Sequence, residues 1–251
     1  MAAAYDTYDY PSYWTGREYE HKSEELAIKT LLKRIPKINT VLELGAGYGR
    51  LTPSYAFRAK KIMLSDPSAK LLSIARKTYG DDKRINYLQL SINKISSKIR
   101  KESIDLAIMI RVIHHIKDIP EAFRIVNRCL KPNGYFILEY ANKSHIKATI
   151  EQFLKGNTTF LLDIFPKEVG KTKRKEKCLP FKNYHPDDIS HELCLSGFDI
   201  LEKLSVSNIR SHQLKKLLSV DVCLSLEKIL QKPLSCLNIG PSIFLLCRKR
   251  G

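Results

Sequence analysis

Short apolar runs alternate with amphipathic segments between residues 40 and 141. The apolar runs end at glycine or polar residues, which is typical of buried strands: TVLELGAG, KIMLSD, INYLQLS, SIDLAIMI and GYFILEYA. The segments between them repeat apolar residues at helical spacing and predict helices: GRLTPSYAFRAK, PSAKLLSIARKTYG and DIPEAFRIVNRCLK. Strands that alternate with helices need crossover connections, so we expect an α/β fold with a doubly wound, mostly parallel sheet.

This alternation stops after residue 141. The next segment contains IEQFLKG and a basic run but no clear strand. Further on, HPDDISHELC predicts a capped helix that ends at Gly197 before a strand, SHQLKKLLSVDVCLSLEKILQK is helical, and PSIFLLCRK is a final strand. We therefore expect four parts: an N-terminal aromatic lid and first helix (1–39), a ligand-binding core (40–141), a cap insertion (142–184), and the rest of the core (185–251) with a helical insertion at about 208–240.

The chain of 251 residues is strongly basic, with 43 Lys and Arg against 26 Asp and Glu and a net charge of +17. Such a charge suits an acidic partner such as nucleic acid. Lysine outnumbers arginine, however, and arginine is the residue favoured for bidentate contacts with phosphates and bases. We expect the densest basic run, 167–178, to be mainly a solvated loop, and contact with a phosphate, an acidic substrate or nucleic acid stays open.

No apolar run approaches the roughly 20 residues that a membrane-spanning helix needs. The N-terminus has no basic segment followed by an apolar core, so no signal peptide is expected. The six cysteines are scattered and form no C-x-x-C pair, which favours reduced thiols over disulfides or a metal site. These features predict a cytoplasmic protein without a metal site.

The segment VLELGAGYGR, residues 41–50, joins a predicted strand to three glycines. Glycine lets the main chain turn sharply or touch a ligand that a side chain would exclude. A dinucleotide fold would need G-x-G-x-x-G, but Arg50 and Thr52 stand where the third glycine would fall. Glu43 precedes the first glycine, and its carboxylate would repel a pyrophosphate but attract an ammonium or sulfonium group.

At this point the sequence resembles the class I S-adenosylmethionine (SAM)-dependent methyltransferases, because VLELGAGYGR matches their first motif over its whole length. IMLSDPS resembles their second motif. DLAIMIRVIHHI and CLKPNGYFILEY are similar to motifs of the branch that includes the ubiquinone-type and type 11 enzymes. The resemblance implies a Rossmann-like seven-stranded sheet with helical cap insertions, SAM as the cofactor and S-adenosylhomocysteine (SAH) as its product.

The resemblance also implies roles for individual residues. Asp66 would hold both ribose hydroxyls, because each carboxylate oxygen can accept one hydrogen bond. Ser91 stands where family members often place an acid near the adenine amino group, and Ile92 would present its backbone N–H to the ring. The alternatives are that Glu43 neutralises nearby lysines and that Asp66 caps the next helix. The expected cofactor contacts are Glu43, Gly45, Ala46, Gly47, Asp66, Pro67, Ser91, Ile92 and Arg17.

Methyl transfer from a sulfonium is an in-line displacement, so positioning and exclusion of water can supply most of the acceleration. A base is needed only where the acceptor is protonated, and no catalytic residue is assigned. His114 and His115 follow the fourth strand, Tyr140 lies with Glu139 at the end of the fifth, and all four would lie near the acceptor. His185 is a further candidate. Packed histidines, and a helix start at His185, are the alternative interpretations.

The N-terminal 20 residues are rich in aromatic side chains: Tyr5, Tyr8, Tyr10, Tyr13, Trp14 and Tyr19. Such a segment can form a lid that excludes water and attracts a sulfonium. Arg17 could pair with the methionine carboxylate of SAM. A surface arm or a dimer contact is the alternative interpretation.

The leading hypothesis is a SAM-dependent methyltransferase acting on an O, N or C atom of a small or lipid-like molecule. The alternatives are an RNA methyltransferase, motivated by the charge, and a non-catalytic SAM-binding interaction protein. The acceptor, the attacked atom and the oligomeric state are not predicted.

Overall fold

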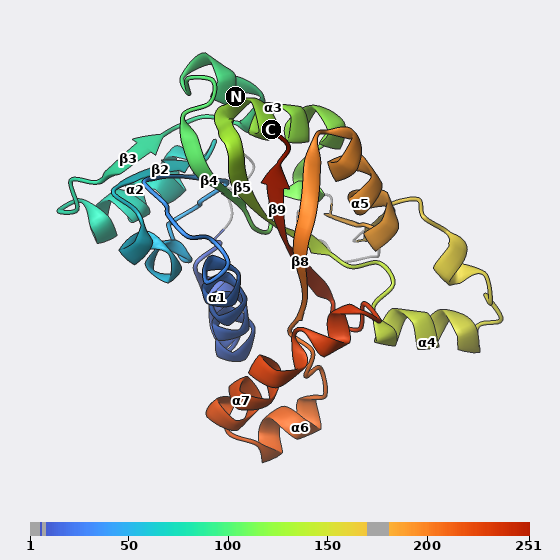
Figure 1. The fold of residues 1–251 in the computed structure, drawn as a ribbon. Coiled ribbons are helices and arrows are strands. Elements are labelled where there is room, and N and C mark those ends of the chain that lie inside the picture. Colours follow the sequence, from blue (N-terminus) through green and yellow to red (C-terminus); the bar gives the residue numbers. More distant parts are fainter. Residues whose placement is uncertain (1–5, 7–8, 170–180) are drawn as a thin grey trace.

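The computed structural model describes residue 6 and residues 9–169 and 181–251 (Figure 1). Its main sheet has seven strands in the order β3-β2-β1-β4-β5-β9-β8. The strands are β1 (Thr40–Leu44), β2 (Lys61–Ser65), β3 (Ile85–Leu88), β4 (Ile104–Met109), β5 (Leu130–Ala141), β8 (Phe198–Val206) and β9 (Ser242–Lys249). The first five strands pair in parallel, and β9 is antiparallel to both β5 and β8. The predicted doubly wound, mostly parallel seven-stranded sheet is confirmed.

Helices cover both faces of this sheet. Alternate side chains of each strand point to opposite faces, and because both sets are apolar, each face is buried by helices. Against one face, α1 (Glu18–Leu32) and α2 (Ala69–Tyr79) pack with residues such as Val41 and Ile108. Against the other face, α3 (Ile119–Cys129) and α5 (Pro186–Leu195) pack with residues such as Leu42. The strands are therefore apolar on both sides, and the buried sheet fixes where the loops at its carboxyl ends begin.

Side-chain caps start α2 and α3. Ser68 Oγ accepts a hydrogen bond from the Leu71 N–H at the start of α2. At the start of α3, Asp118 accepts one from Glu121. These caps satisfy backbone donors that have no partner within the helix.

One predicted helix is wrong. The segment GRLTPSYAFRAK forms two short 3₁₀ turns, Thr52–Ser54 and Ala56–Arg58, in place of an α-helix. Pro53 supplies no backbone N–H, and the Tyr55 side chain turns into the core, where it is fully buried and donates a hydrogen bond to Glu43. The interrupted backbone thus places a hydroxyl group beneath the glycine loop.

The segment after β5 also differs from the expectation of no clear strand. It contains α4 (Ile146–Leu154), a 3₁₀ turn (Phe160–Leu162) and a small antiparallel pair, β6 (Lys167–Val169) with β7 (Phe181–Asn183). These strands have only three residues each, too few for a recognisable alternation. Most of the basic run 167–178, from residue 170 on, lies outside the described residues.

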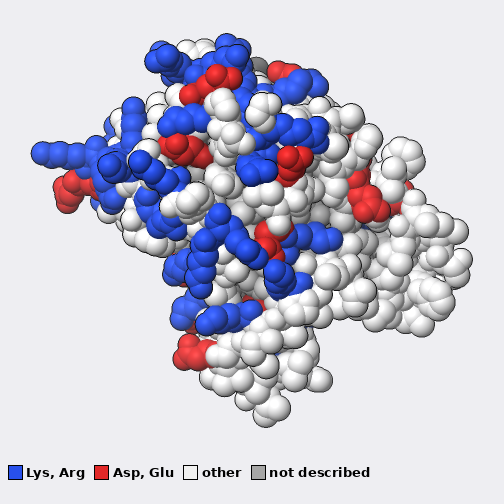
Figure 2. Space-filling view, viewed as in Figure 1, with Lys and Arg blue, Asp and Glu red and all other residues white. Residues whose placement is uncertain are grey.

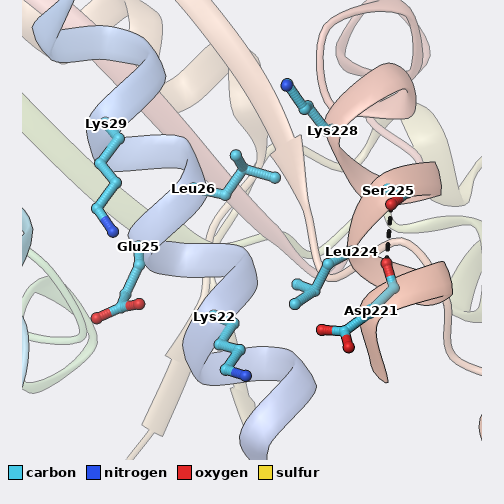
Figure 3. A pocket seen from close by; sticks show the side chains of 8 residues that line it. All are labelled: Lys22, Glu25, Leu26, Lys29, Asp221, Leu224, Ser225 and Lys228. Carbon is cyan, nitrogen blue, oxygen red and sulfur yellow. Dashed lines mark hydrogen bonds between the residues drawn. The ribbon is translucent and has the colours of Figure 1, made fainter. Parts of the chain in front are cut away.

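Two further helices, α6 (His212–Leu217) and α7 (Val220–Leu230), connect β8 to β9 and extend the molecule below α1 (Figure 1). Buried Glu227 fastens α7 to α1, because it accepts a hydrogen bond of 2.6 Å from the Tyr19 hydroxyl. Between α1 and α7 lies an open groove, which Lys22, Glu25, Asp221 and Lys228 help to line (Figure 3). It is separate from the strand-end loops, since all of its lining residues belong to α1 and α7.

None of the helices in the described part of the chain combines the length and the apolar character that spanning a membrane requires.

Candidate functional site

The glycine loop lies where β1 ends, between its neighbours β2 and β4. Gly45, Gly47 and Gly49 have φ angles of +67°, +56° and +77°, in the left-handed region that favours glycine. A Cβ atom at Gly45 would lie 2.2 Å from Val112 Cγ2, and one at Gly49 would lie 2.7 Å from Tyr79 Cε2. Gly45 and Gly49 are therefore required both by backbone conformation and by space.

Asp66 follows β2 and reaches back to this loop. Its Oδ2 accepts a hydrogen bond of 2.9 Å from the Gly47 N–H, and its Oδ1 accepts one of 2.8 Å from the Ser68 N–H. Burial raises the pKa of Asp66, and the two backbone hydrogen bonds partly offset this effect. The carboxylate is thus fixed beside the loop, and Ser68, not Asp66, supplies the side-chain cap of α2.

A cavity of about 370 Å³ opens next to Gly45. Its walls include four of the residues predicted to contact a cofactor: Gly45, Pro67, Ser91 and Ile92. The remaining walls come mostly from the loop after β4, including Val112 and His115. The parallel strands bring these segments together because their carboxyl ends meet at one edge of the sheet.

Glu43 lies on β1 beneath the loop and is buried. Its Oε2 accepts a hydrogen bond from the Tyr55 hydroxyl and a longer one, of 3.3 Å, from Thr52 Oγ1. Burial raises the pKa of Glu43 to about 7, although these hydrogen bonds favour the charged form. The carboxylate is therefore held by the chain's own hydroxyl groups, and its expected contact with an ammonium stays a prediction.

Sequence reasoning missed an ion cluster beside the loop, formed by buried Glu24 with the partly exposed Arg50 and Arg111. Arg50 Nη2 lies 2.5 Å from Glu24 Oε2, and Arg111 Nη2 lies 2.5 Å from Glu24 Oε1. Burial opposes the charge of Glu24, but the Arg111 and Arg50 guanidiniums hold its pKa below the usual value. Arg50 directly follows the glycine loop and Arg111 follows β4 as a break in an apolar run, which are the signals that could have revealed them.

Arg111 is held in an unusual backbone conformation, with a φ of +59°. Its backbone N–H donates a hydrogen bond of 2.7 Å to Glu139 Oε2, and Ser242 Oγ donates one of 2.5 Å to Glu139 Oε1. Burial raises the pKa of Glu139, while the Arg111 charge lowers it. Glu139 thus fixes the loop after β4, and a non-glycine residue at positive φ is typical of strained functional loops.

We call the residues before α1 the N-terminal arm, of which the structure describes residue 6 and residues 9–17. This arm lies over the ion cluster. The Trp14 ring centroid is 3.5 Å from Arg50 Cζ and 4.8 Å from Arg111 Cζ, and Tyr10 contacts Tyr48 of the glycine loop. Asp6 accepts a hydrogen bond of 2.6 Å from Ser68 Oγ. The arm therefore touches segments on both sides of the loop, whereas Tyr5 and Tyr8 lie outside the described residues.

Arg17 lies at the edge of this arm. Its side chain is exposed, and its Cζ lies 4.2 Å from the Tyr13 ring centroid. Its predicted pairing with a cofactor carboxylate is not tested by these contacts.

The histidines after β4 lie against β7 and the residue that follows it, Tyr184. The His114 ring is buried, and its centroid lies 4.2 Å from that of Phe181 and 4.1 Å from that of His115. Tyr184, just after β7, donates a hydrogen bond of 3.3 Å to the Ile113 carbonyl. Burial holds the pKa of His114 well below its usual value, so the ring is neutral at pH 7. Its Nδ1 has no hydrogen-bond partner among the described residues.

The other two catalytic candidates lie in structural positions. His185 is the N-cap of α5, where its Nδ1 accepts a hydrogen bond of 3.2 Å from the Asp187 N–H. Tyr140 is fully buried in the core on the α3 and α5 side of the sheet, and its hydroxyl has no partner among the described residues. Tyr140 and its neighbour Glu139 point to opposite faces, as successive residues of a strand do. Among the described residues no group of His, Cys, Asp and Glu is arranged to hold a metal ion.

Comparison with known proteins agrees with this geometry. Residues 42–138 match the family model Methyltransf_11, described as a methyltransferase domain. An uncharacterized methyltransferase of Schizosaccharomyces pombe, C25B8.09, is 30% identical over 184 residues, which cover 68% of this chain and 70% of that protein. A ubiquinone biosynthesis O-methyltransferase of Sinorhizobium medicae is 24% identical over 167 residues, which cover 66% of this chain and 62% of that protein.

Solved structures share the fold. The N-methyltransferase NodS of Bradyrhizobium japonicum, crystallised with SAH, gives a TM-score of 0.60 at 14% identity over 98% of this chain and 95% of that chain. A possible histamine N-methyltransferase of Thermotoga maritima gives 0.63 at 18% identity over 98% of both chains. With the glycine loop, the acid after β2 and this strand order, the chain belongs to the class I SAM-dependent methyltransferases, and SAM is its cofactor.

Proposed function

We propose that this methyltransferase transfers a methyl group to an O, N or C atom of a small or lipid-like molecule, with SAM bound along the glycine loop. The observation that carries the proposal is the cavity lined by Gly45, Pro67, Ser91 and Ile92, together with the Asp66 carboxylate that accepts a hydrogen bond from the nearby Gly47 N–H. SAM carries an adenosine, an ammonium and a sulfonium but no phosphate, and an acid-lined loop suits that chemistry.

The proposed contacts follow from hydrogen-bonding capacity. Each Asp66 oxygen accepts one backbone N–H and keeps a second lone pair, so the carboxylate can still accept both ribose hydroxyls. Pro67, Ser91 and Ile92 would surround the adenine, while Gly45, Ala46 and Gly47 would lie along the rest of the molecule. Glu43 would act on the ammonium through the field of its buried carboxylate. Arg17 stays the proposed partner of the methionine carboxylate, since Arg50 and Arg111 already share Glu24.

SAM, when bound, supplies an electrophilic methyl group on a sulfonium. The chain's own residues would position the two reactants and exclude water. We propose that the N-terminal arm contributes to exclusion, since Tyr10 and Trp14 cover the loop and the ion cluster. Neutral His114 could accept a proton at Nδ1, but its low pKa makes it a weak base. This favours an acceptor atom that attacks through a free lone pair or gives up its proton easily.

The acceptor would approach from the side of His114, Phe181 and Tyr184. The apolar and aromatic character of this region supports a small aromatic or lipid-like acceptor. Similarity to a ubiquinone biosynthesis O-methyltransferase supports the same class, although that identity is 24%.

Transfer of labelled methyl groups tests this proposal. A cell extract would be incubated with the enzyme and SAM that carries an isotopically labelled methyl group, and the products would be identified by mass spectrometry. We expect label in one or a few small or lipid-extractable molecules. The Asp66→Ala variant should lose the labelling, whereas Asp82→Ala, at an exposed carboxylate paired with Arg84, should retain it. Label that appears only in protein would contradict the proposed acceptor class.

RNA is a second candidate acceptor because of the charge of the chain. Figure 2 shows Lys and Arg gathered over the half of this face that carries α2 and β3 in Figure 1. Label in RNA, together with binding to RNA that weakens steeply as salt rises, would favour this candidate over a small molecule.

A further inference from the structure

The segment after β5 presents its apolar side chains to solvent. We call residues 146–165 the α4 limb, which Figure 1 shows extending away from the sheet. None of the nine residues of α4 is buried. Phe153, Leu154, Leu162 and Phe165 are 65%, 80%, 78% and 76% exposed. The exposed large apolar residues of the limb are Ile146, Ile150, Phe153, Leu154, Leu161, Leu162, Ile164 and Phe165.

These side chains form an ordered surface. Ile146, Ile150, Phe153 and Leu154 are spaced i, i+4, i+7 and i+8, so they lie along one side of α4. Lys147, Glu151 and Lys155 follow the neighbouring side, where Lys155 Nζ lies 2.7 Å from Glu151 Oε1. The helix is therefore amphipathic with its apolar side unpartnered. A contiguous exposed apolar patch marks an interaction site in a folded protein.

The limb is fastened at its base, so its exposure is a property of the folded chain. Lys143 is 3% exposed, and its Nζ donates hydrogen bonds of 2.6 and 2.7 Å to the carbonyls of Asp163 and Phe165. The same ammonium lies 2.6 Å from Asp163 Oδ2. At the other end, the Ile146 N–H donates a hydrogen bond of 3.1 Å to the Ile239 carbonyl. A buried lysine thus joins the two ends of the limb.

The charge of the whole chain, not of the limb alone, favours an anionic occupant. On the limb, Lys147 and Lys155 are balanced by Glu151 and Asp163, and Lys155 pairs with Glu151 while Asp163 pairs with buried Lys143. The whole chain carries +17, which opposes a second copy as the occupant and favours an acidic surface. In Figure 2 the lower right of the molecule, where Figure 1 places α4, is almost wholly uncharged on this face.

We propose that the α4 limb docks on the surface of a lipid bilayer that contains anionic phospholipid. Its apolar side chains would enter the boundary between headgroups and acyl chains, and its lysines would contact the phosphates, as interfacial amphipathic helices do. The limb starts a few residues after β5, whose carboxyl end lies beside the loop with His114. Resting on the proposed function, this placement would let the enzyme take a lipid-like acceptor from the surface on which it docks.

Co-sedimentation with vesicles tests docking without any knowledge of the acceptor. The full chain would be mixed with vesicles of phosphatidylcholine alone and with vesicles that also contain phosphatidylglycerol. We expect binding to the mixed vesicles to be at least roughly tenfold stronger, because each lysine near an anionic surface adds to the affinity. The double variant Phe153→Ser and Leu162→Ser should weaken that binding by roughly tenfold or more.

The matched control is Phe57→Ser, since Phe57 is 66% exposed on a turn outside the limb. It should bind vesicles as the wild type does. All three proteins should bind SAH equally, which shows that the fold is intact and separates a failure of docking from a failure of the methyltransferase assignment. Absence of vesicle binding, equal binding to neutral vesicles, or equal loss in the control would overturn the proposal. A wild-type dimer in solution that the double variant abolishes would assign the limb to self-association and overturn it too.

Discussion

The glycine-loop region and the α4 limb contrast in what they expose. Around the loop, the carboxylates of Glu24, Glu43, Asp66 and Glu139 are all buried. Each of them accepts at least one hydrogen bond. On the limb, apolar side chains are exposed without partners. Buried charge must be paired to be tolerated, and these hydrogen bonds supply the pairing; a region built from paired polar groups suits a small polar ligand. Covering the exposed apolar side chains of the limb with another surface would be favourable, because it removes them from water.

The strongest test of this contrast removes the carboxylate at the centre of the buried side. Glu24→Gln would remove the shared anion of Arg50 and Arg111, whose side chains are 10% and 21% exposed. Loss of one partner of a buried ion pair costs about 3–5 kcal/mol, and we expect a decrease near the lower end of that range in the free energy of unfolding, measured with urea, because water reaches the two arginines in part.

The matched control for this variant is Glu18→Gln on the same helix. Glu18 is exposed and pairs with partly exposed Lys22, its one ion-pair partner in the described part of the chain, so the free energy of unfolding should change by less than about 0.5 kcal/mol. Equal effects of the two variants would show that the cluster contributes no more than a surface pair.

A second test uses pH, because burial raises the pKa of Glu43 to about 7 from 4.5. The unfolded chain releases this proton at lower pH than the folded chain does, so Glu43 reduces stability as pH rises from 4.5 towards 7. At pH values above 7, the resulting decrease in the free energy of unfolding should reach roughly 3 kcal/mol. Urea unfolding of the wild type and of Glu43→Gln across this range should show a loss that is larger in the wild type by about this amount, because Asp66 and Glu139, whose pKa values are also raised, are present in both proteins. Parallel pH profiles would contradict a buried, protonatable Glu43.

A third test adds one methyl group to the loop. In Gly45→Ala the new Cβ would meet Val112 at 2.2 Å in a backbone conformation that side chains disfavour. We expect a loss of about 2–3 kcal/mol in the free energy of unfolding together with weaker SAH binding. Gly156→Ala is the control on the limb side, since Gly156 has a similar positive φ but no atom within 4 Å of its Cβ position. It should lose about 1 kcal/mol and bind SAH normally.

The sequence was sufficient for the sheet and for the position of the glycine loop at the end of β1, because their signals are local. Apolar runs, glycine spacing and the acid after the second strand can be read directly, and the structure brings Gly45, Pro67, Ser91 and Ile92 around one cavity. The Glu24–Arg50–Arg111 cluster was missed because its members are distant in sequence and meet only through the fold. The helix predicted at 49–60 failed because Tyr55 packs inward to reach Glu43. The spacing of residues along the chain does not predict such tertiary contacts.

Titration of the full chain with SAH by calorimetry tests the central claim most directly, namely that the cofactor binds along the glycine loop and contacts Asp66. We predict a single site in the wild type, with affinity reduced roughly 10- to 100-fold in Asp66→Ala, since a hydrogen bond to a charged group contributes about 1.5–3 kcal/mol. Asp82→Ala should bind as the wild type does. No binding by the wild type, or unchanged affinity in Asp66→Ala, would contradict the account.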